Sequence, residues 1–406
     1  MKSNRIILLL LMVIPFMTSS AKNLSTSASN VAGASGKAVA VKTDKKSLSR
    51  QEADSALKEL VEQWKNDVRE NLRQDYTGKA IHHDTLEMKI WTRLFGQAPE
   101  GERSMFISMH GGGSAPHEIN EQQWHNQKIL YEPSEGLYVA PRAPWDEWNM
   151  WFKPGMDELL KKLINAAVVF DGVNPNKVYL MGYSAGGDGV WRMAPRMADT
   201  WAAASMMAGH PGTVKMDNLR NLPYMIWCGE LDAAYDRNTL DTQKGKELDA
   251  MQAADPMGFI HETHIVKGKG HWMDRLDTLA VSWMKQYQRN AYPQKVVWLQ
   301  DDEILKNDFY WIHVSDLELG KGKKVIVNRE GNTISIEQSD YRTLTFMIND
   351  EMMNLDKPVV VKWHDKVIFK KRLKRTRANL RQTLYSRNDP AYAFPAMVTV
   401  KVEPAP

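Results

Sequence analysis

Residues 49–84 carry apolar side chains at helical spacing. Ser49 precedes the first turn and Glu52 follows three residues later, which is the arrangement of a capping box at a helix start. The apolar positions then recur every three or four residues and share one face of a helix, so they predict an N-terminal helical segment with a single buried stripe. These positions are Ala53, Leu57, Leu60, Val61, Trp64, Val68 and Leu72.

From residue 85 to residue 290 the pattern alternates between short apolar runs and amphipathic segments. The alternating pattern of residues 87–95 is typical of an outer strand, and helices are predicted for 154–170, after Ser184, and for 239–254. Strand–helix alternation favours a mostly parallel sheet with helices on both faces, so we expect an α/β catalytic domain. The other predicted strands are residues 104–109, 136–140, 177–181, 201–209, 222–228 and 259–266.

After residue 290 short apolar runs separated by turns replace this alternation. Their spacing predicts a small C-terminal β-sandwich-like domain over residues 291–406, with one helix at 378–386. The predicted strands are residues 309–315, 323–328, 332–337, 342–348, 357–363, 366–371 and 396–402.

The N-terminus has the order of a secretory signal. Lys2 and Arg5 precede an apolar run over residues 6–17, and small polar residues follow it, so we predict a signal peptide at 1–21. A retained membrane anchor is the alternative, but the run is shorter than the roughly 20 residues that span a bilayer. Residues 22–48 are rich in Ser, Ala, Gly, Lys and Thr and predict a flexible leader. We therefore expect a secreted or periplasmic protein without a stable membrane anchor.

The cysteine count and the net charge exclude some kinds of site and partner. Cys228 is the only cysteine among 406 residues, which excludes an intramolecular disulfide and a cysteine-cluster metal site. The net charge of +4 falls to +2 when Lys2 and Arg5 leave with the signal, which is too small to indicate nucleic acid binding. We interpret the basic run from Lys370 to Arg375 as a solvated strand edge. No metal or cofactor is predicted.

The segment from Gly182 to Gly186 places Ser184 where a predicted strand ends and a helix begins. Glycines on both sides of the serine let the backbone turn sharply, which would expose the serine oxygen and leave the Ala185 N–H free at the helix start. Tight packing is the alternative reason for the glycines. We expect Asp188, farther along this helix, to interact with the helix dipole rather than with a reacting group.

Three further segments supply what a reactive serine needs. His110 follows a predicted core strand and precedes the glycine run 111–113. The N–H groups of such glycines can stabilise the negative charge of a tetrahedral intermediate by hydrogen bonds. We expect His110 itself to anchor this loop. Asp232 follows the strand 222–228, and His271 follows the strand 259–266 on a glycine-rich loop. A serine hydroxyl needs such a base, and the base needs an orienting acid.

Together these segments resemble the α/β-hydrolase superfamily, in particular its secreted serine esterase, carboxylesterase and depolymerase-like branches. The resemblance covers about residues 85–290 and matches the chain order serine, acid, histidine. It implies Ser184 as nucleophile, His271 as general base and Asp232 as its partner, with Glu230 and Asp236 as rival acids. It also implies an oxyanion hole made by Ala185 and either Gly112 or Gly113.

The substrate is less narrowly defined by the sequence. Trp145, Trp148 and Trp151 follow a predicted strand at the edge of the sheet where ligands bind in open α/β folds, and we predict that they line the pocket with His210 and Trp272. The expected reaction is hydrolysis of a carboxylic ester, on a small molecule or on a polymer such as a polysaccharide. A serine peptidase with the same triad and a non-catalytic binding protein that keeps the fold are the alternatives.

Overall fold

The computed structural model describes residues 44–403. The predicted signal peptide and most of the predicted leader lie outside this range. Within it the backbone already makes hydrogen bonds ahead of the first helix: Leu48 N–H donates to Arg375 O at 2.9 Å, and Ala378 N–H donates to Asp44 O at 2.9 Å. Ordered contacts therefore begin before residue 49. None of the helices in residues 44–403 is long and apolar enough to cross a membrane.

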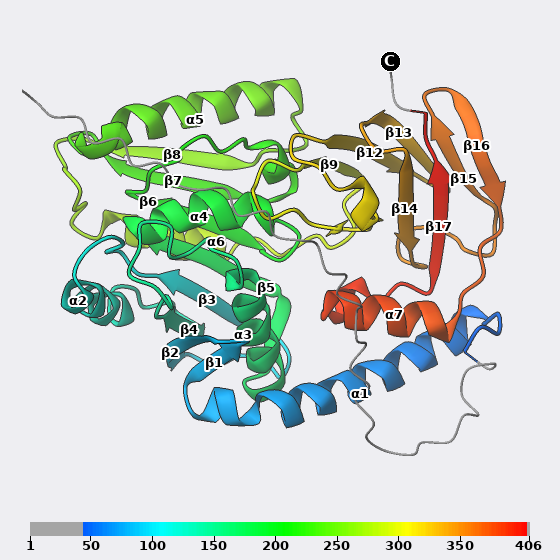
Figure 1. The fold of residues 1–406 in the computed structure, drawn as a ribbon, viewed down its shortest axis with the longest axis horizontal. Coiled ribbons are helices and arrows are strands. Elements are labelled where there is room, and N and C mark those ends of the chain that lie inside the picture. The colour runs from blue at the N-terminus through cyan, green and yellow to red at the C-terminus, as the bar shows by residue number, and fades with distance from the viewer. Residues whose placement is uncertain (1–43, 404–406) are drawn as a thin grey trace, which may run out of the picture. The chain divides into compact units, whose positions relative to one another are not determined.

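Helix α1 (Arg50–Thr77) confirms the predicted N-terminal helix and its capping box. The Ser49 hydroxyl accepts from Glu52 N–H at 3.2 Å, and the Glu52 carboxylate accepts from Ser49 N–H at 2.7 Å. Figure 1 shows α1 running past β1, α3 and α7, with which it is in contact. The segment is not helical to residue 84, because the chain turns at Gly78 and forms strand β1 (Ala80–His83). The buried side of α1 consists of Ala53, Ala56, Leu60, Trp64, Val68, Leu72 and Tyr76.

An eight-stranded sheet forms the centre of the α/β part, in the order β1-β2-β4-β3-β5-β6-β7-β8. The pairs β1·β2 and β2·β4 are antiparallel, and the remaining pairs are parallel. Strand β1 rather than β2 is therefore the outermost strand at this edge. The parallel strands β3 to β7 are almost fully buried, as expected for strands covered on both faces. Their bounds are β2 (Leu86–Phe95), β3 (Arg103–Met109), β4 (Gly136–Pro141), β5 (Val173–Tyr183), β6 (Ala203–Met207), β7 (Tyr224–Gly229) and β8 (His261–Val266).

Helices cover both faces of this sheet, which confirms the predicted fold class. On one face, Met105 and Ile107 of β3 join a core that includes residues of α1, α3 and α4. On the other face, Phe106 joins a second core that includes Trp283 of α6 and packs against Trp124 of α2. Neighbouring strand residues thus point into opposite layers, as the period of two along a strand requires. The helices are α2 (His117–Lys128), α3 (Met156–Phe170), α4 (Ala185–Arg196), α5 (Arg237–Ala254) and α6 (Leu279–Met284).

Two β-sheets and a helix follow, in agreement with the predicted sandwich-like C-terminal part. The predicted strand 309–315 is wrong in one respect: Tyr310 has φ 53° and turns the chain, so the segment forms a short hairpin of two strands. Strand β9 (Lys295–Leu299) was not predicted. The basic run begins in β16, which is an edge strand as expected. One sheet has the order β16-β15-β13-β12-β9, with β12 (Lys324–Glu330), β13 (Thr333–Ser339), β15 (Val359–Trp363) and β16 (Lys366–Lys371). The other has the order β10-β11-β14-β17, with β10 (Asp308–Phe309), β11 (Ile312–His313), β14 (Thr343–Ile348) and β17 (Ala396–Lys401). The helix is α7 (Arg377–Arg387).

The C-terminal sheets share a hydrophobic core with the α/β part. Trp298 and Phe346 belong to the same cluster of buried side chains as Trp64 and Trp191. Buried ion pairs also join the two parts: Arg196 of α4 contacts Asp302 at 2.8 Å, and Arg387 of α7 contacts Asp199. The described residues form one compact unit. The predicted boundary near residue 290 therefore separates sheets and not independent cores.

Candidate active site

Ser184 lies in a strained turn between β5 and α4. Its backbone has φ 59° and ψ −122°, a conformation that is rare for any residue with a side chain. The flanking glycines are required by close backbone contacts: a Cβ on Gly182 would lie 2.3 Å from Gly186 O, and a Cβ on Gly186 would lie 2.1 Å from Met109 O. The glycines thus allow the turn that presents the Ser184 hydroxyl at the carboxyl end of the sheet.

The candidate triad is assembled in this structure. His271 Nε2 lies 2.9 Å from Ser184 Oγ, and His271 Nδ1 lies 2.7 Å from Asp232 Oδ2. With the proton on Nδ1, the ring donates to the carboxylate and accepts from the serine hydroxyl. Of the three candidate acids, Asp232 bonds to His271, whereas Glu230 accepts from Gly268 N–H at 2.8 Å and the side chain of Asp236 is not bonded to the histidine. Asp232 is 2% exposed, so water hardly competes for its carboxylate.

Short backbone contacts hold the loop that carries Asp232 against the loop that carries His271. A Cβ on Gly229 would lie 2.0 Å from Gly270 O, so the two backbones approach as closely as glycine permits. Leu231 N–H donates to Lys269 O at 2.8 Å. The separation between Asp232 and His271 is therefore set by the backbone as well as by their own hydrogen bond.

Tyr183, the residue before the serine, is a positioning group that the sequence analysis did not identify. Its hydroxyl donates to His271 O at 2.5 Å and accepts from Met273 N–H at 3.3 Å. Its ring also stands edge-on to the His271 ring, with centroids 5.8 Å apart. The strand that leads to Ser184 thereby also anchors the loop that carries His271.

The glycine loop after β3 lies beside the serine. A Cβ on Gly111 would be 3.2 Å from Ser184 Cβ, and a Cβ on Gly113 would be 3.4 Å from Ala185 Cβ. The Gly113 N–H donates to Asn120 Oδ1 at 2.9 Å and is therefore occupied. Gly112 N–H has no hydrogen-bond partner among residues 44–403, and Ala185 is the first residue of α4, whose N–H lacks a partner within the helix. The Gly112 and Ala185 N–H groups are therefore free to serve as the candidate oxyanion donors.

Asn120 fixes the shape of this loop from α2, a helix that the sequence analysis missed. Its amide nitrogen donates to Gly113 O at 3.0 Å and to Ala115 O at 2.9 Å, while its oxygen accepts from Gly113 N–H. Asn120 is fully buried. A single side chain thus satisfies several backbone groups of the glycine loop.

His110 anchors the other end of the loop, as expected. Its Nδ1–H donates to Gly111 O at 2.6 Å, and its Nε2 accepts from Ala143 N–H at 3.2 Å. Burial lowers the pKa of His110 to about 3, so the ring stays neutral and can keep both roles. The Trp151 indole N–H donates to His110 O at 2.9 Å.

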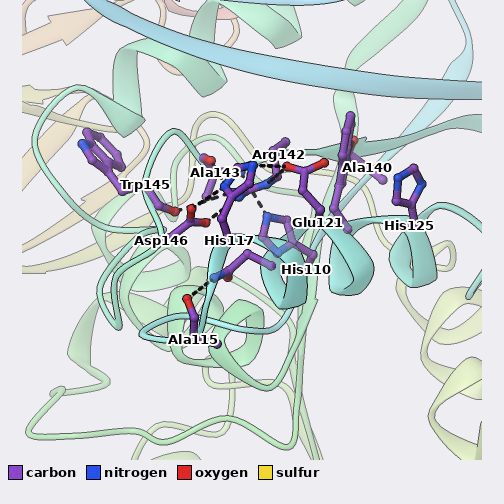
Figure 2. A network of polar contacts seen from close by, with 12 residues as sticks. His110, Ala115, His117, Glu121, His125, Ala140, Arg142, Ala143, Trp145 and Asp146 are labelled. Atoms are coloured by element: carbon purple, nitrogen blue, oxygen red, sulfur yellow. Dashed lines mark hydrogen bonds and ion pairs between the residues drawn. The ribbon is translucent and has the colours of Figure 1, made fainter.

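A polar network supports the loop from outside (Figure 2). Arg142 Nε donates to Glu121 at 2.8 Å, and its Nη2 donates to Asp146 at 2.5 Å. Asp146 also bonds to His117 Nδ1 at 2.7 Å. Because Glu121 and His117 lie on α2 while Arg142 and Asp146 follow β4, the network ties α2 to the chain after β4 (Figure 2).

A cavity of about 460 Å³ opens at Ser184 and is lined by side chains from five segments of the chain. Trp148 and His210 lie in its wall, as predicted. Trp151 does not, because its ring is completely buried in the core behind His110. Trp145 is likewise outside the lining, since it packs against the core with Lys153 over its ring. Trp272 is also outside the lining; its ring packs against the Tyr183 ring, and half of its surface is exposed. The lining consists of Gly112, Ser114, Ala115, Trp148, Phe152, Ser184, Ala185, Asp188, Arg192, His210, Gly212, Tyr235 and Arg237.

Asp188 has a different contact from the one expected. Its carboxylate accepts from His210 N–H at 2.6 Å and so fixes the loop after β6, in addition to lying near the start of α4. Burial raises the pKa of Asp188, and the His210 hydrogen bond only partly offsets this effect. Within residues 44–403 no cluster of three or more His, Cys, Asp or Glu side chains could hold a metal ion.

The strand order, the strained serine turn and the order serine, acid, histidine along the chain define the fold as that of an α/β-hydrolase. No family model matches the sequence, and no curated protein matches it either. Solved structures that resemble the chain include esterases and serine hydrolases. A thermostable esterase is 15% identical with a TM-score of 0.41, and the match covers 52% of this chain and 62% of that one.

Two other similar structures are esterases whose names include a substrate or a bound acid. An acetyl xylan esterase from Aspergillus awamori is 11% identical with a TM-score of 0.36, over 48% of this chain and 93% of its own. Est1E from Butyrivibrio proteoclasticus, with ferulic acid bound, is 16% identical with a TM-score of 0.33, over 51% of this chain and 96% of its own. The chain spans less than two thirds of the thermostable esterase. At TM-scores below 0.5 these likenesses carry no argument about substrate, which must come from the site itself.

Proposed function

We propose that the protein is a serine esterase that hydrolyses carboxylic esters through an acyl-enzyme at Ser184. The observation that carries the proposal is the continuous hydrogen-bonded chain from Ser184 Oγ through His271 to the buried Asp232. The strained serine turn and the adjacent glycine loop support it, because the turn exposes the serine hydroxyl and the loop brings backbone N–H groups beside it.

In the proposed reaction Ser184 Oγ attacks the ester carbonyl carbon while His271 Nε2 takes the hydroxyl proton. The carbonyl oxygen becomes negative and accepts hydrogen bonds from Gly112 and Ala185 N–H. The bond to the leaving oxygen then breaks, and His271 returns the proton to the departing alcohol. In the second half, His271 takes a proton from water, the hydroxide attacks the acyl carbon, and Ser184 leaves with that proton as the free acid is released.

Export and a polymer-linked substrate form the finer part of the proposal. The basic and apolar N-terminal sequence supports export, and the burial of Cys228 suits a free thiol in an oxidising compartment. The mass of the protein recovered from its native host would locate the cleavage site, which we expect near residue 21. A panel of acetyl, feruloyl, longer-acyl and polyester substrates would identify the acyl group.

The Ser184→Ala variant tests the catalytic part. Loss of the nucleophile is expected to lower kcat for a simple aryl ester by about a millionfold. A fluorophosphonate probe should label the wild type and not the variant. Hydrolysis by Ser184→Ala within tenfold of wild type would reject the proposal. Faster turnover of a peptide amide than of its matched ester would favour the peptidase alternative, and absence of labelling in a folded wild type would favour a binding protein.

A further inference from the structure

Two arginines in the cavity wall have no carboxylate partner. Arg192 lies on α4, two turns after the nucleophile, and Arg237 is the first residue of α5. Both line the cavity that opens at Ser184. Their charges are therefore available to whatever group enters beside the reacting ester.

Arg237 differs from the other buried arginines of residues 44–403. Six arginines are buried, and the five others each pair with a carboxylate. Arg237 is 8% exposed, yet the one hydrogen bond of its side chain is from Nη1 to Ala234 O at 3.3 Å, and its buried Nε–H has no partner among the described residues. A buried charged group with unused donors costs stability. Such a group at the wall of a cavity is suited to bind an anion.

Arg192 lines the same cavity from α4. Its guanidinium lies 5.9 Å from the Phe152 ring centroid, and a Cβ on Gly212 would lie 2.7 Å from its Nη2. Its guanidinium makes no hydrogen bond or ion pair with the described residues. Gly212 and Phe152 both line the cavity, so the head of Arg192 is placed within the wall.

The nearby acids do not remove this positive character. Asp188 is engaged with His210 N–H, and burial raises its pKa. Asp241, one turn along α5 from Arg237, is fully buried and does not line the cavity, and burial raises its pKa well above the usual value. Asp232 is committed to His271. The groups facing the cavity thus include two guanidinium ions against the single carboxyl of Asp188.

From this arrangement we infer that the esterase acts on esters that carry a carboxylate, which Arg237 and Arg192 bind while Ser184 attacks the ester group. The inference rests on the proposed function and specifies its substrate class. The aromatic wall of Trp148, Phe152 and Tyr235 suits an apolar or planar spacer between the two groups. The carboxylate belongs to the acyl part or to the alcohol part of the ester, and the experiment separates these two sources.

The experiment compares matched charged and neutral esters at pH 7. In the acyl arm, mono-4-nitrophenyl adipate is compared with 4-nitrophenyl hexanoate. In the alcohol arm, 4-acetoxybenzoate is compared with its methyl ester. For each pair the ratio of kcat/KM, charged over neutral, is measured for wild type, Arg237→Met, Arg192→Met and the double variant. Arg69→Met, on α1, is the control that loses the same charge outside the cavity lining.

We expect the ratio to fall about tenfold or more in one arm for each cavity variant and to stay at the wild-type value for Arg69→Met. Free adipate should also inhibit the wild type more strongly than adipamide, and this difference should shrink at high salt. This second measurement does not depend on whether the variants fold. An unchanged ratio in both arms, or equal inhibition by adipate and adipamide, overturns the inference. If the wild type hydrolyses the neutral esters as fast as the charged ones, only the inference fails. If it hydrolyses neither the charged nor the neutral esters, the proposed function fails.

Discussion

The turn that carries Ser184 provides a quantitative test in the substitution Gly186→Ala. The new Cβ would lie 2.1 Å from Met109 O, 2.7 Å from Met109 C and 2.9 Å from His110 O. All three are backbone atoms, so no flexible side chain can move aside. Contacts of a Cβ below 3.0 Å are essentially not observed, so the turn and the glycine loop must separate by about 0.9 Å.

This displacement acts on both halves of the site, because Met109 and His110 lead into the oxyanion loop while Gly186 follows the nucleophile. A misplacement of about 1 Å typically costs about 100-fold in rate. Overpacking of this kind also costs about 1–3 kcal/mol in the free energy of unfolding. We therefore expect Gly186→Ala to fold with a lower melting temperature and to lose about 100-fold in kcat/KM.

The assay is hydrolysis of 4-nitrophenyl acetate together with thermal unfolding followed by circular dichroism. Gly320→Ala is the matched control: its new Cβ would approach only the flexible side chain of Lys323, at 3.1 Å. The control should keep wild-type activity. If Gly186→Ala keeps kcat/KM within threefold of wild type, the turn does not set the geometry of the site and the reasoning is refuted.

Three further substitutions test separate parts of the account. Asp232→Asn should lower kcat about 10⁴-fold, because the amide favours the wrong His271 tautomer, while fluorophosphonate labelling slows in parallel; a loss under tenfold would contradict this. Tyr183→Phe removes the hydroxyl bond to His271 O, about 1 kcal/mol of stability, and should lower kcat with little change in KM; an unchanged kcat would contradict the positioning role. Burial alone would raise the pKa of Asp157, but Lys306 and Arg196 hold it below its usual value, so its stabilising effect is present above about pH 4 and is lost as pH falls through the folded pKa. Urea unfolding should therefore show Asp157→Asn about 3–5 kcal/mol less stable than wild type at pH 7, with the gap narrowing below pH 4; a gap independent of pH would contradict the ion pair.

The sequence predicted those features that depend on hydrophobic periodicity and on glycine placement. The parallel strands β3, β4, β6 and β7 are mostly apolar, and the glycines around Ser184 are required by backbone contacts, so both left a clear pattern. Helix α2 left none, because the residues it buries are the polar Asn120 and Gln127. The Asn120 side chain that holds the glycine loop therefore could not be found from periodicity.

The pocket shows a second limit of sequence reasoning. Trp148 and Trp151 are three residues apart in one irregular segment, yet Trp148 is 62% exposed at the cavity and Trp151 is completely buried. Only the fold determines which ring faces the substrate. Arg192 and Arg237 are 45 positions apart in the chain, so the sequence does not indicate that they act together. The fold shows it, because α4 and α5 place both in the wall of one cavity and no carboxylate of the described residues forms an ion pair with either.

The central claim is that Ser184 carries the acyl group during turnover. The most direct measurement is to mix the enzyme with 4-nitrophenyl acetate, quench the reaction with acid in the burst phase, and locate the added acetyl group by peptide mass spectrometry. We predict an acetyl group on the peptide that contains Ser184, with none on this peptide in Ser184→Ala. Turnover without an acetylated Ser184, or with the acetyl group on another residue, would contradict the account.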